Sequence, residues 1–373
     1  MHILAEIPTT PAIGVASEAS EAPNAPNALK KTQRRIFELL VLTLSLWVSL
    51  CASAGVAGPD DTAERILPPP HSLPHTLPLR LTDDRGRSIQ LNQSAKRIVS
   101  LSPSITELVF EAGAGGKLVG VSRYSDYPGA ARSIENVGDS SNLDLERIVA
   151  LKPDLVIAWR SGNAISDIEK LEKLGLTVFA TDAARLEDIP RLLRIAGKLA
   201  GTSTQAESAA SVFEAALQQI RHSYGNHSKI KVFQLIWHQP LMTVNGDHVI
   251  SDIIELCGGV NIFASSPSLT PVISAENLIE ADPQVIISSV SREFAESEVR
   301  GLLRRFSHIS AVRHNHLYFV HPDLIHRQTA RMIQAAKTVC AQLENVRSAQ
   351  GAHGDGAVPR SMRVHTRSRV ASI

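Results

Sequence analysis

Aromatic side chains that follow the ends of predicted strands are the best candidates for binding chemistry in this chain. Aromatic residues make up only 4% of the 373 residues, so each one is informative. Tyr124, Trp159 and Trp237 each come shortly after an apolar, strand-like run, whereas Tyr127 precedes Pro128 and is expected to be structural. Flat rings that carry a polar tip bind flat, largely apolar ligands and orient them. The pattern therefore predicts a binding site built from aromatic faces.

A polar stretch near the end of the chain supplies the second set of candidates. It follows the apolar run His316–Val320 and consists of Asp323, Leu324, Ile325, His326 and Arg327. Because ligands of doubly wound folds lie outside the carboxyl ends of the strands, we expect this stretch to line the same site. Glu107 is interpreted instead as a first-turn helix residue that the helix dipole favours.

Several histidines raise the alternative of a metal-binding protein. His308, His314, His316, His321 and His326 crowd one stretch of the sequence, and imidazoles are good ligands for zinc. However, no histidine is paired with carboxylates at ligand spacing, and His314 and His316, which flank the start of a predicted strand, are expected to be solvated. We therefore predict no metal ligands, with a zinc or manganese receptor as the alternative.

Catalytic motifs are absent from the sequence. There is no Walker A sequence, no Gly-x-Gly-x-x-Gly after a strand and no Gly-x-Ser-x-Gly. A hydrolase that uses His238 or His326 as its base would also need a positioned nucleophile and an orienting group. We predict a binding protein that is not an enzyme, has no catalytic residues and needs no cofactor. The net charge of +1 argues against nucleic acid as a partner.

Strands and helices alternate through two stretches of the chain, which a long amphipathic helix at Thr202–Tyr224 separates. Alternation of this kind predicts parallel sheets covered by helices. The predicted fold is α/β: two doubly wound lobes with parallel sheets, joined by a single long helix. The apolar face of this helix is predicted to contain Ala206, Ala209, Val212, Phe213, Ala216, Leu217, Ile220 and Tyr224. The predicted segments are an N-terminal lobe at 79–201, the linker helix at 202–226, a C-terminal lobe at 227–346 and a disordered basic tail at 347–373.

The two predicted lobes contain a short repeat. Glu146 precedes Pro153 by seven positions, and Glu276 precedes Pro283 by seven positions, with a buried strand after each proline. A single glutamate on a helix is usually only solvated. Equivalent positions in two repeats suggest that both carboxylates serve one purpose.

The N-terminus resembles an export signal. Basic residues at 30–35 precede an apolar run at 36–50, and a small-x-small cleavage site follows at Ala52–Ala54. Residues 1–54 are thus predicted to be an export signal and 55–78 a Pro-rich linker, and a retained or lipidated anchor at Cys51 is the alternative. Cleavage leaves Cys257 and Cys340, which in an exported chain are expected to pair, with two buried free thiols as the alternative.

Together these residues resemble the periplasmic solute-binding proteins of the helical-linker type, and within them the vitamin B12-binding branch. The resemblance spans residues 79 to 346. It rests on Arg97–Pro103, Ser122–Pro128, Leu145–Arg160, Cys257–Phe263 and Asp323–Arg331. The first and last stretches are also shared with haem- and siderophore-binding relatives, so a haem or ferric-siderophore receptor is an alternative function.

The resemblance implies a periplasmic, monomeric protein that captures a corrinoid, most closely vitamin B12 (cobalamin), and delivers it to an ABC permease. It implies that Tyr124 and Trp159 line the corrinoid site, with the segment Asp323–Arg327 at the opposite lip, and Trp237 is expected to compensate from the second lobe for pocket aromatics that this chain lacks. A corrin ring is a large, mostly apolar plate fringed with amides, which suits aromatic faces and a few polar tips. The chain departs from the family at Ser140, Leu324 and Ile325, where aromatic residues are expected.

The resemblance also assigns roles outside the ligand site. Glu146 and Glu276, one in each lobe, are implied to dock onto arginines of the membrane permease. Cys257 and Cys340 match the positions of the family's disulfide. The long helix is implied to be a stiff spine, so that the two lobes shift little when ligand binds.

Overall fold

The computed structural model describes residues 78–290 and 293–354, which all belong to one compact unit. The predicted export signal and the linker up to residue 77 lie outside the described residues, as does the tail from residue 355. No helix in the described part of the chain is long and apolar enough to cross a membrane.

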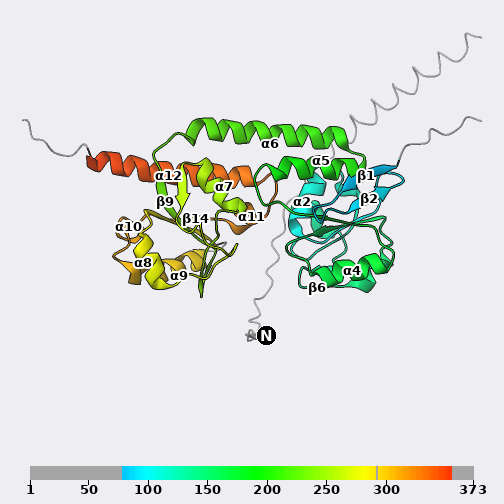
Figure 1. Ribbon diagram of the computed structural model, residues 1–373, viewed down its shortest axis with the longest axis horizontal. Helices are drawn as coiled ribbons and strands as arrows, with labels where there is room; N and C mark the ends of the chain where they lie inside the picture. The colour runs from blue at the N-terminus through cyan, green and yellow to red at the C-terminus, as the bar shows by residue number, and fades with distance from the viewer. Residues whose placement is uncertain (1–77, 291–292, 355–373) are drawn as a thin grey trace, which may run out of the picture. The chain divides into compact units, whose positions relative to one another are not determined.

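The N-terminal lobe is built around a parallel sheet of four strands in the order β4-β3-β7-β8. An antiparallel hairpin precedes the sheet, and helices follow its strands (Figure 1). The elements are β1 (Leu79–Thr82), β2 (Ser88–Leu91), β3 (Ile98–Ser100), α2 (Pro103–Glu111), β4 (Leu118–Val121), β5 (Gly138–Asp139), β6 (Asn142–Leu143), α3 (Leu145–Ala150), β7 (Leu155–Trp159), α4 (Ile165–Lys173), β8 (Val178–Thr181) and α5 (Asp188–Ala200).

The C-terminal lobe repeats this plan with a parallel sheet in the order β12-β9-β13-β14. Its strands are largely buried, as expected when helices cover both faces of a parallel sheet. The elements are β9 (Ile230–Leu235), β10 (Trp237–His238), β11 (Leu241–Met242), α7 (Val249–Leu256), β12 (Gly259–Asn261), α8 (Ala275–Ala281), β13 (Val285–Ser289), α9 (Glu293–Leu303), α10 (Ser310–Arg313), β14 (Leu317–Val320), α11 (Pro322–Ile325) and α12 (Met332–Gly354). The predicted class of fold is confirmed.

Helix α6 (Ser203–Tyr224) joins the two lobes. It packs on α5 of the first lobe and on α7 and α12 of the second (Figure 1). Its buried residues recur at steps of three and four and are Ala206, Ala210, Phe213, Leu217 and Ile220. The prediction that Val212 belongs to this face was wrong, because its side chain is 68% exposed and the helical turn brings Ala210 inward instead.

A double ion pair fastens α6 to α5. The guanidinium of Arg194 on α5 contacts Glu207 at 2.8 Å and Glu214 at 2.6 Å, both on α6. Glu207 and Glu214 lie seven residues apart, which is about two helical turns and places both on the same face of α6, toward Arg194. Their hydrogen bonds to Arg194 lower the pKa of both carboxyl groups. The spine is therefore tied to the first lobe along its surface as well as through its core.

Helix α12 is longer than expected. The sequence predicts a helix that ends at residue 346, whereas α12 continues to Gly354. Arg347 anchors the start of this extension, because its guanidinium donates to the carbonyl oxygens of Ser228 at 2.9 Å and Cys257 at 2.8 Å. The two acceptors lie far from Arg347 in sequence, so the local sequence pattern could not reveal these hydrogen bonds.

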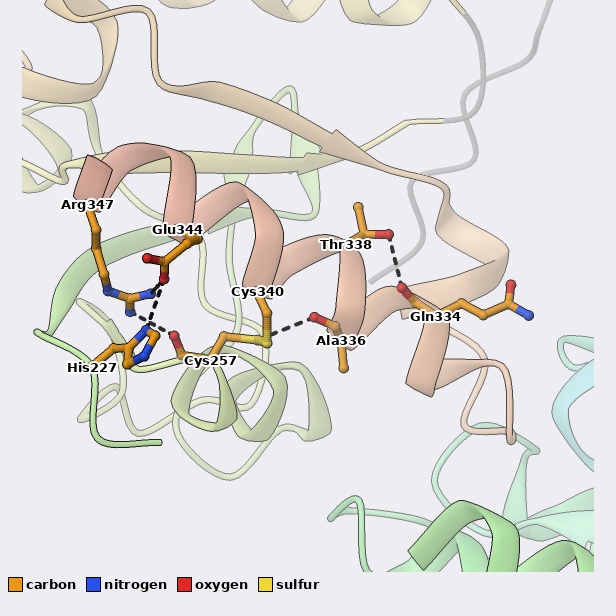
Figure 2. The surroundings of a disulfide bond; sticks show 8 residues. All are labelled: His227, Cys257, Gln334, Ala336, Thr338, Cys340, Glu344 and Arg347. Atoms are coloured by element: carbon orange, nitrogen blue, oxygen red, sulfur yellow. Dashed lines mark hydrogen bonds and ion pairs between the residues drawn. A yellow bond between two sulfur atoms is a disulfide. The ribbon is translucent and has the colours of Figure 1, made fainter. Parts of the chain in front are cut away.

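The predicted disulfide between Cys257 and Cys340 is present, with an S–S distance of 2.04 Å (Figure 2). It connects the end of α7 to α12 across 83 residues of sequence. Polar side chains surround it: Glu344 lies 3.1 Å from Arg347 and 2.9 Å from His227. The bond therefore lies in a well-anchored corner of the C-terminal lobe.

A carboxylate of α7 links the two lobes beside the spine. Oδ2 of Asp252 accepts a hydrogen bond of 2.9 Å from the backbone N–H of Leu186, which precedes α5. Oδ1 lies 2.9 Å from Nη2 of Arg185, although the angle is too poor for a hydrogen bond. Burial raises the pKa of Asp252 to about 6, which outweighs these favourable contacts. The link therefore consists of one hydrogen bond and one imperfect ion pair.

Candidate ligand-binding site

The predicted site residues lie at the carboxyl ends of the two parallel sheets. Tyr124 follows β4 and Trp159 ends β7 in the first lobe, while Trp237 follows β9 and the segment Asp323–Arg327 follows β14 in the second. In doubly wound folds this edge of the sheet is where ligands bind.

Tyr124 is presented on a strained turn. Its ring is 69% exposed, and its backbone has a φ of 68°, a left-handed value that is unusual for a bulky residue. The following residue, Ser125, is buried and holds the turn through hydrogen-bond contacts with Thr106 at 3.0 Å and Ser122 at 3.4 Å. Strain of this kind persists where the surroundings enforce it, often at ligand-binding sites.

Trp159 is half-buried and fixed in orientation. Its indole Nε1 donates to Asp182 at 3.3 Å, and its backbone N–H donates to Asn163 at 2.7 Å. Its ring lies against Gly162, where a Cβ atom would come within 1.9 Å of the ring. One face of the indole thus packs on the lobe, and the polar edge is satisfied, which leaves a rigid aromatic surface at the strand end.

Trp237 forms one wall of a surface cavity in the second lobe. It lies on the short β10–β11 hairpin, is 56% exposed, and donates from Nε1 to the carbonyl oxygen of Gln239 at 2.8 Å. The cavity holds about 370 Å³ at the carboxyl ends of β9, β13 and β14. It is lined by Ile236, Trp237, His238, Ser288, Ser289, Val290, Pro322 and His326.

Two imidazoles face this cavity, and they differ in their partners. His238 Nε2 lies 3.3 Å from Glu298, whereas the ring of His326 has no hydrogen-bond partner among the described residues. Burial lowers the pKa of His326 and outweighs the charge of Asp323. The lowered pKa favours the neutral imidazole of His326, whose ring nitrogens are available for hydrogen bonds beside the aromatic wall of Trp237.

The segment Asp323–Arg327 divides between the surface and the core. Ile325 is fully buried in the main hydrophobic cluster, and Leu324 packs against the same cluster. A short helix, α11, turns these aliphatic side chains inward, so Ile325 supports the segment from beneath and does not line the surface. The polar members Asp323, His326 and Arg327 remain as the candidates for ligand contact.

Arg327 bridges the two lobes. Its Nη1 donates to Glu107 at 2.9 Å and to Asp126 at 2.8 Å, both in the first lobe, while Nη2 contacts Asp323 at 3.0 Å. Burial alone would raise the pKa of Asp126, but the hydrogen bond and charge of Arg327 lower it. In this structure the guanidinium is committed to three carboxylates, and its predicted contact with ligand stays a prediction.

Glu107 is the centre of this bridge. The expectation that it is a first-turn residue was wrong, because α2 begins at Pro103 and has no acidic residue in its first turn. Its side chain is 3% exposed and also pairs with Arg331 of the second lobe at 3.1 Å. The guanidinium of Arg331 in turn lies 4.2 Å from the ring centre of Tyr127. Tyr127 therefore contributes to contact between the lobes.

Asp126 and Arg331 lie in the recognised stretches Ser122–Pro128 and Asp323–Arg331, but no contact between the lobes was predicted for either residue, and Glu107 was misread. One signal was available: Glu107 is a single charged residue inside the apolar stretch Ile105–Val109. A buried carboxylate must be paired, so its place on the inward face of a helix predicts a cationic partner. The partner itself, 220 residues away in sequence, could not be read from spacing.

The two predicted docking glutamates occupy equivalent places. Glu146 and Glu276 are each the second residue of a short helix, α3 and α8, and both side chains are exposed. The helices are capped alike: Asp144 accepts from the N–H of Arg147 and Ser274 from that of Asn277. The burial of successive residues follows the same order through both helices. The repeat seen in the sequence is therefore a structural repeat, with one carboxylate presented on each lobe.

The chain belongs to the periplasmic binding protein family, whose pattern matches residues 98–324. This confirms the resemblance on which the sequence-based predictions rest.

Several known proteins are similar to this chain in sequence or in fold. The vitamin B12-binding protein of Vibrio campbellii is 35% identical over 257 residues, which cover 69% of this chain and 92% of that protein. The crystal structure of the periplasmic vitamin B12-binding protein BtuF of Vibrio cholerae shares 34% identity, with a TM-score of 0.64 over 68% of this chain and 98% of that one. A periplasmic heme-binding protein from Pseudomonas aeruginosa, 22% identical with a TM-score of 0.60 over 66% of this chain and 92% of that one, shares the fold.

Proposed function

We propose that this protein captures a corrinoid, vitamin B12 in particular, and delivers it to the permease of an ABC importer. The observation that carries the proposal is the set of aromatic side chains at the carboxyl ends of both sheets. Tyr124 and Trp159 belong to one lobe and Trp237 to the other. The proteins at about 35% identity that are named vitamin B12-binding proteins support the same ligand.

The chemistry of these side chains suits a corrin ring. Trp159 is a fixed aromatic surface, while Tyr124 and Trp237 are 69% and 56% exposed and so available for contact. The amides on the rim of the ring need hydrogen-bond partners, and the free imidazole of His326 and the carboxylate of Asp323 supply them. The spine and the Arg327 bridge hold the lobes together, so little conformational order needs to be gained on binding.

The proposal also covers the localisation and the partners of the protein. The N-terminal segment up to Ala54 would direct export, and the protein would act in the periplasm as a monomer. It would bind and release its ligand unchanged, without an enzymatic step or a resident cofactor. Its partners would be the corrinoid and the transmembrane subunits of the permease, not nucleic acid.

The first test is calorimetric titration of the purified protein with cyanocobalamin, haemin and zinc. We expect one cyanocobalamin per chain, and recovery of the bound cobalamin unaltered. Trp159→Ala and Trp237→Ala should each weaken binding by about 1–3 kcal/mol, because each removes a large aromatic contact face. The exposed Trp237 is the safer variant if Trp159→Ala is poorly folded, and Val212→Ala, which alters an exposed side chain of the spine, is the control.

Haemin is the main alternative to a corrinoid as the ligand of this site. The unpartnered imidazole of His326 could serve as an axial ligand to haem iron. Micromolar binding of haemin with no heat from cyanocobalamin would replace the proposed ligand by haem. Retention of full cyanocobalamin affinity in both tryptophan variants would exclude the proposed site while leaving the ligand in place.

Docking to the permease gives a separate prediction. We expect the double variant Glu146→Arg/Glu276→Arg to bind cyanocobalamin normally and to lose transport about tenfold or more, since charge reversal opposes a complementary surface. Hydrogen bonds from its own N–H and from Ser274 lower the pKa of Glu276, which keeps that carboxylate ionised. Transport would be measured by uptake of labelled cobalamin into vesicles that contain the permease.

A matched control reverses one exposed acidic residue in each lobe away from α3 and α8, namely Glu169→Arg/Glu255→Arg. This variant has the same net charge as the docking variant and should transport normally. Equal losses in both variants would mean that net charge alone is responsible, and weakened ligand binding in the docking variant would place its glutamates near the ligand.

A further inference from the structure

Two imidazoles lie side by side at the edge of the C-terminal sheet opposite the ligand site. His314 and His316 precede β14, whereas the candidate ligand-binding segment follows it. Asn315 between them has a φ of 56°, a left-handed turn that asparagine tolerates well. The turn places the two ring centres 5.8 Å apart with the planes inclined by 31°.

Both imidazoles are held in one tautomer. Nδ1 of His314 lies 2.9 Å from the carbonyl oxygen of Ser310, and Nδ1 of His316 lies 3.1 Å from the carbonyl oxygen of Gln284. A carbonyl oxygen can only accept, so Nδ1 carries the proton in each ring when the ring is neutral. Nε2 is then left with its lone pair unshared. Histidine ligands of metals are typically oriented by this same hydrogen bond from the second ring nitrogen to a carbonyl.

We propose that His314 and His316 form a binding site for a divalent transition-metal ion, distinct from the corrinoid site. Two imidazoles on one ion, with metal–nitrogen bonds of about 2.0–2.1 Å, have ring centres roughly 5 to 6 Å apart. The observed separation of 5.8 Å falls in this range. The described residues include no group of three or more His, Cys, Asp or Glu side chains that could hold a metal. Water would complete the coordination of an ion held by these two imidazoles.

The surroundings leave room for a hydrated ion. An open cavity of about 500 Å³ is lined by both histidines and by Ala349 and Gln350 of α12. The neighbouring cation, Arg313, is directed toward the hydroxyl of Ser310 at 3.4 Å. Imidazole ligands favour Cu²⁺ over Ni²⁺ and Zn²⁺ and have little affinity for Mg²⁺. We therefore expect affinity to follow that order.

The test is titration of the purified protein with Cu²⁺, Ni²⁺, Zn²⁺ and Mg²⁺ in a non-coordinating buffer. The wild-type protein should bind one Cu²⁺, and its electron paramagnetic resonance spectrum should show coupling to two imidazole nitrogens. His314→Gln/His316→Gln should weaken Cu²⁺ binding at least tenfold and remove that coupling. His222→Gln/His308→Gln, which removes two exposed histidines elsewhere, should change the affinity less than twofold.

Each outcome decides the proposal. Unchanged Cu²⁺ affinity in the His314/His316 variant would show that copper binds elsewhere and would overturn the proposal. Absence of Cu²⁺ binding by the wild type at about 100 µM, which corresponds to a binding free energy weaker than about 5 kcal/mol, would also exclude the site. Tighter binding of Mg²⁺ than of Cu²⁺ would show carboxylate and not imidazole coordination. Cyanocobalamin binding, measured in the same samples, should be equal in all three proteins.

Discussion

Replacing Glu107 with Gln is expected to lower the free energy of unfolding by about 3 kcal/mol, the scale for breaking a buried ion pair by removing one partner. The carboxylate is 3% exposed and contacts Arg327 at 2.9 Å and Arg331 at 3.1 Å. Gln keeps the shape but removes the charge, so two half-buried guanidiniums lose their shared anion. Urea denaturation of the two proteins measures the difference.

The matched control for this prediction is Glu207→Gln. Glu207 also pairs with an arginine, Arg194, but it is 57% exposed, and Arg194 keeps Glu214 as a second partner. Exposed ion pairs contribute less than about 1 kcal/mol, so the control should lose little stability. Equal losses of unfolding free energy in the two variants would show that the Glu107 bridge between the lobes stabilises the protein no more than an exposed ion pair does. A loss confined to Glu107→Gln would establish it as a main link between them.

Removing the disulfide is expected to have the other large effect. Closure of an 83-residue loop lowers the conformational entropy of the unfolded chain, which in the loop-entropy description stabilises the folded protein by about 4 kcal/mol. Cys257→Ala/Cys340→Ala should therefore lose about that much free energy of unfolding, measured by urea denaturation. In the wild type, alkylation of the denatured protein without reductant should leave positions 257 and 340 unmodified, as detected by peptide mapping.

Reduction of the wild-type protein separates the bond from the packing of its sulfur atoms. Both cysteines are fully buried, so the alanine variant also loses some apolar contact. Reduced wild type should be about as unstable as the variant, within about 1 kcal/mol. If reduction leaves stability unchanged, the bond contributes nothing to folding. If positions 257 and 340 are alkylated without reductant, the bond does not form in the purified protein.

Apolar periodicity alone predicted the class of fold, because sheets buried on both faces need continuous apolar strands and the connecting helices need one apolar stripe. The long helix predicted at Thr202–Tyr224 begins one residue later in the structure, at Ser203, and ends where expected. The same strand ends located the aromatic candidates Tyr124, Trp159 and Trp237. The pairing of Cys257 with Cys340 was also predictable, since an exported chain with two remaining cysteines has one possible bond.

Contacts between residues far apart in sequence were decided only by the tertiary structure. The Glu107–Arg327 pair spans 220 residues, and no local pattern specifies which buried carboxylate meets which guanidinium. Ile325 was grouped with its polar neighbours, but packing against the core turned it inward. The tautomers of His314 and His316 likewise depend on carbonyl groups supplied by other elements. Sequence determines which side chains are available at each strand end, whereas long-range packing determines which remain free to bind, because only it settles their partners and their burial.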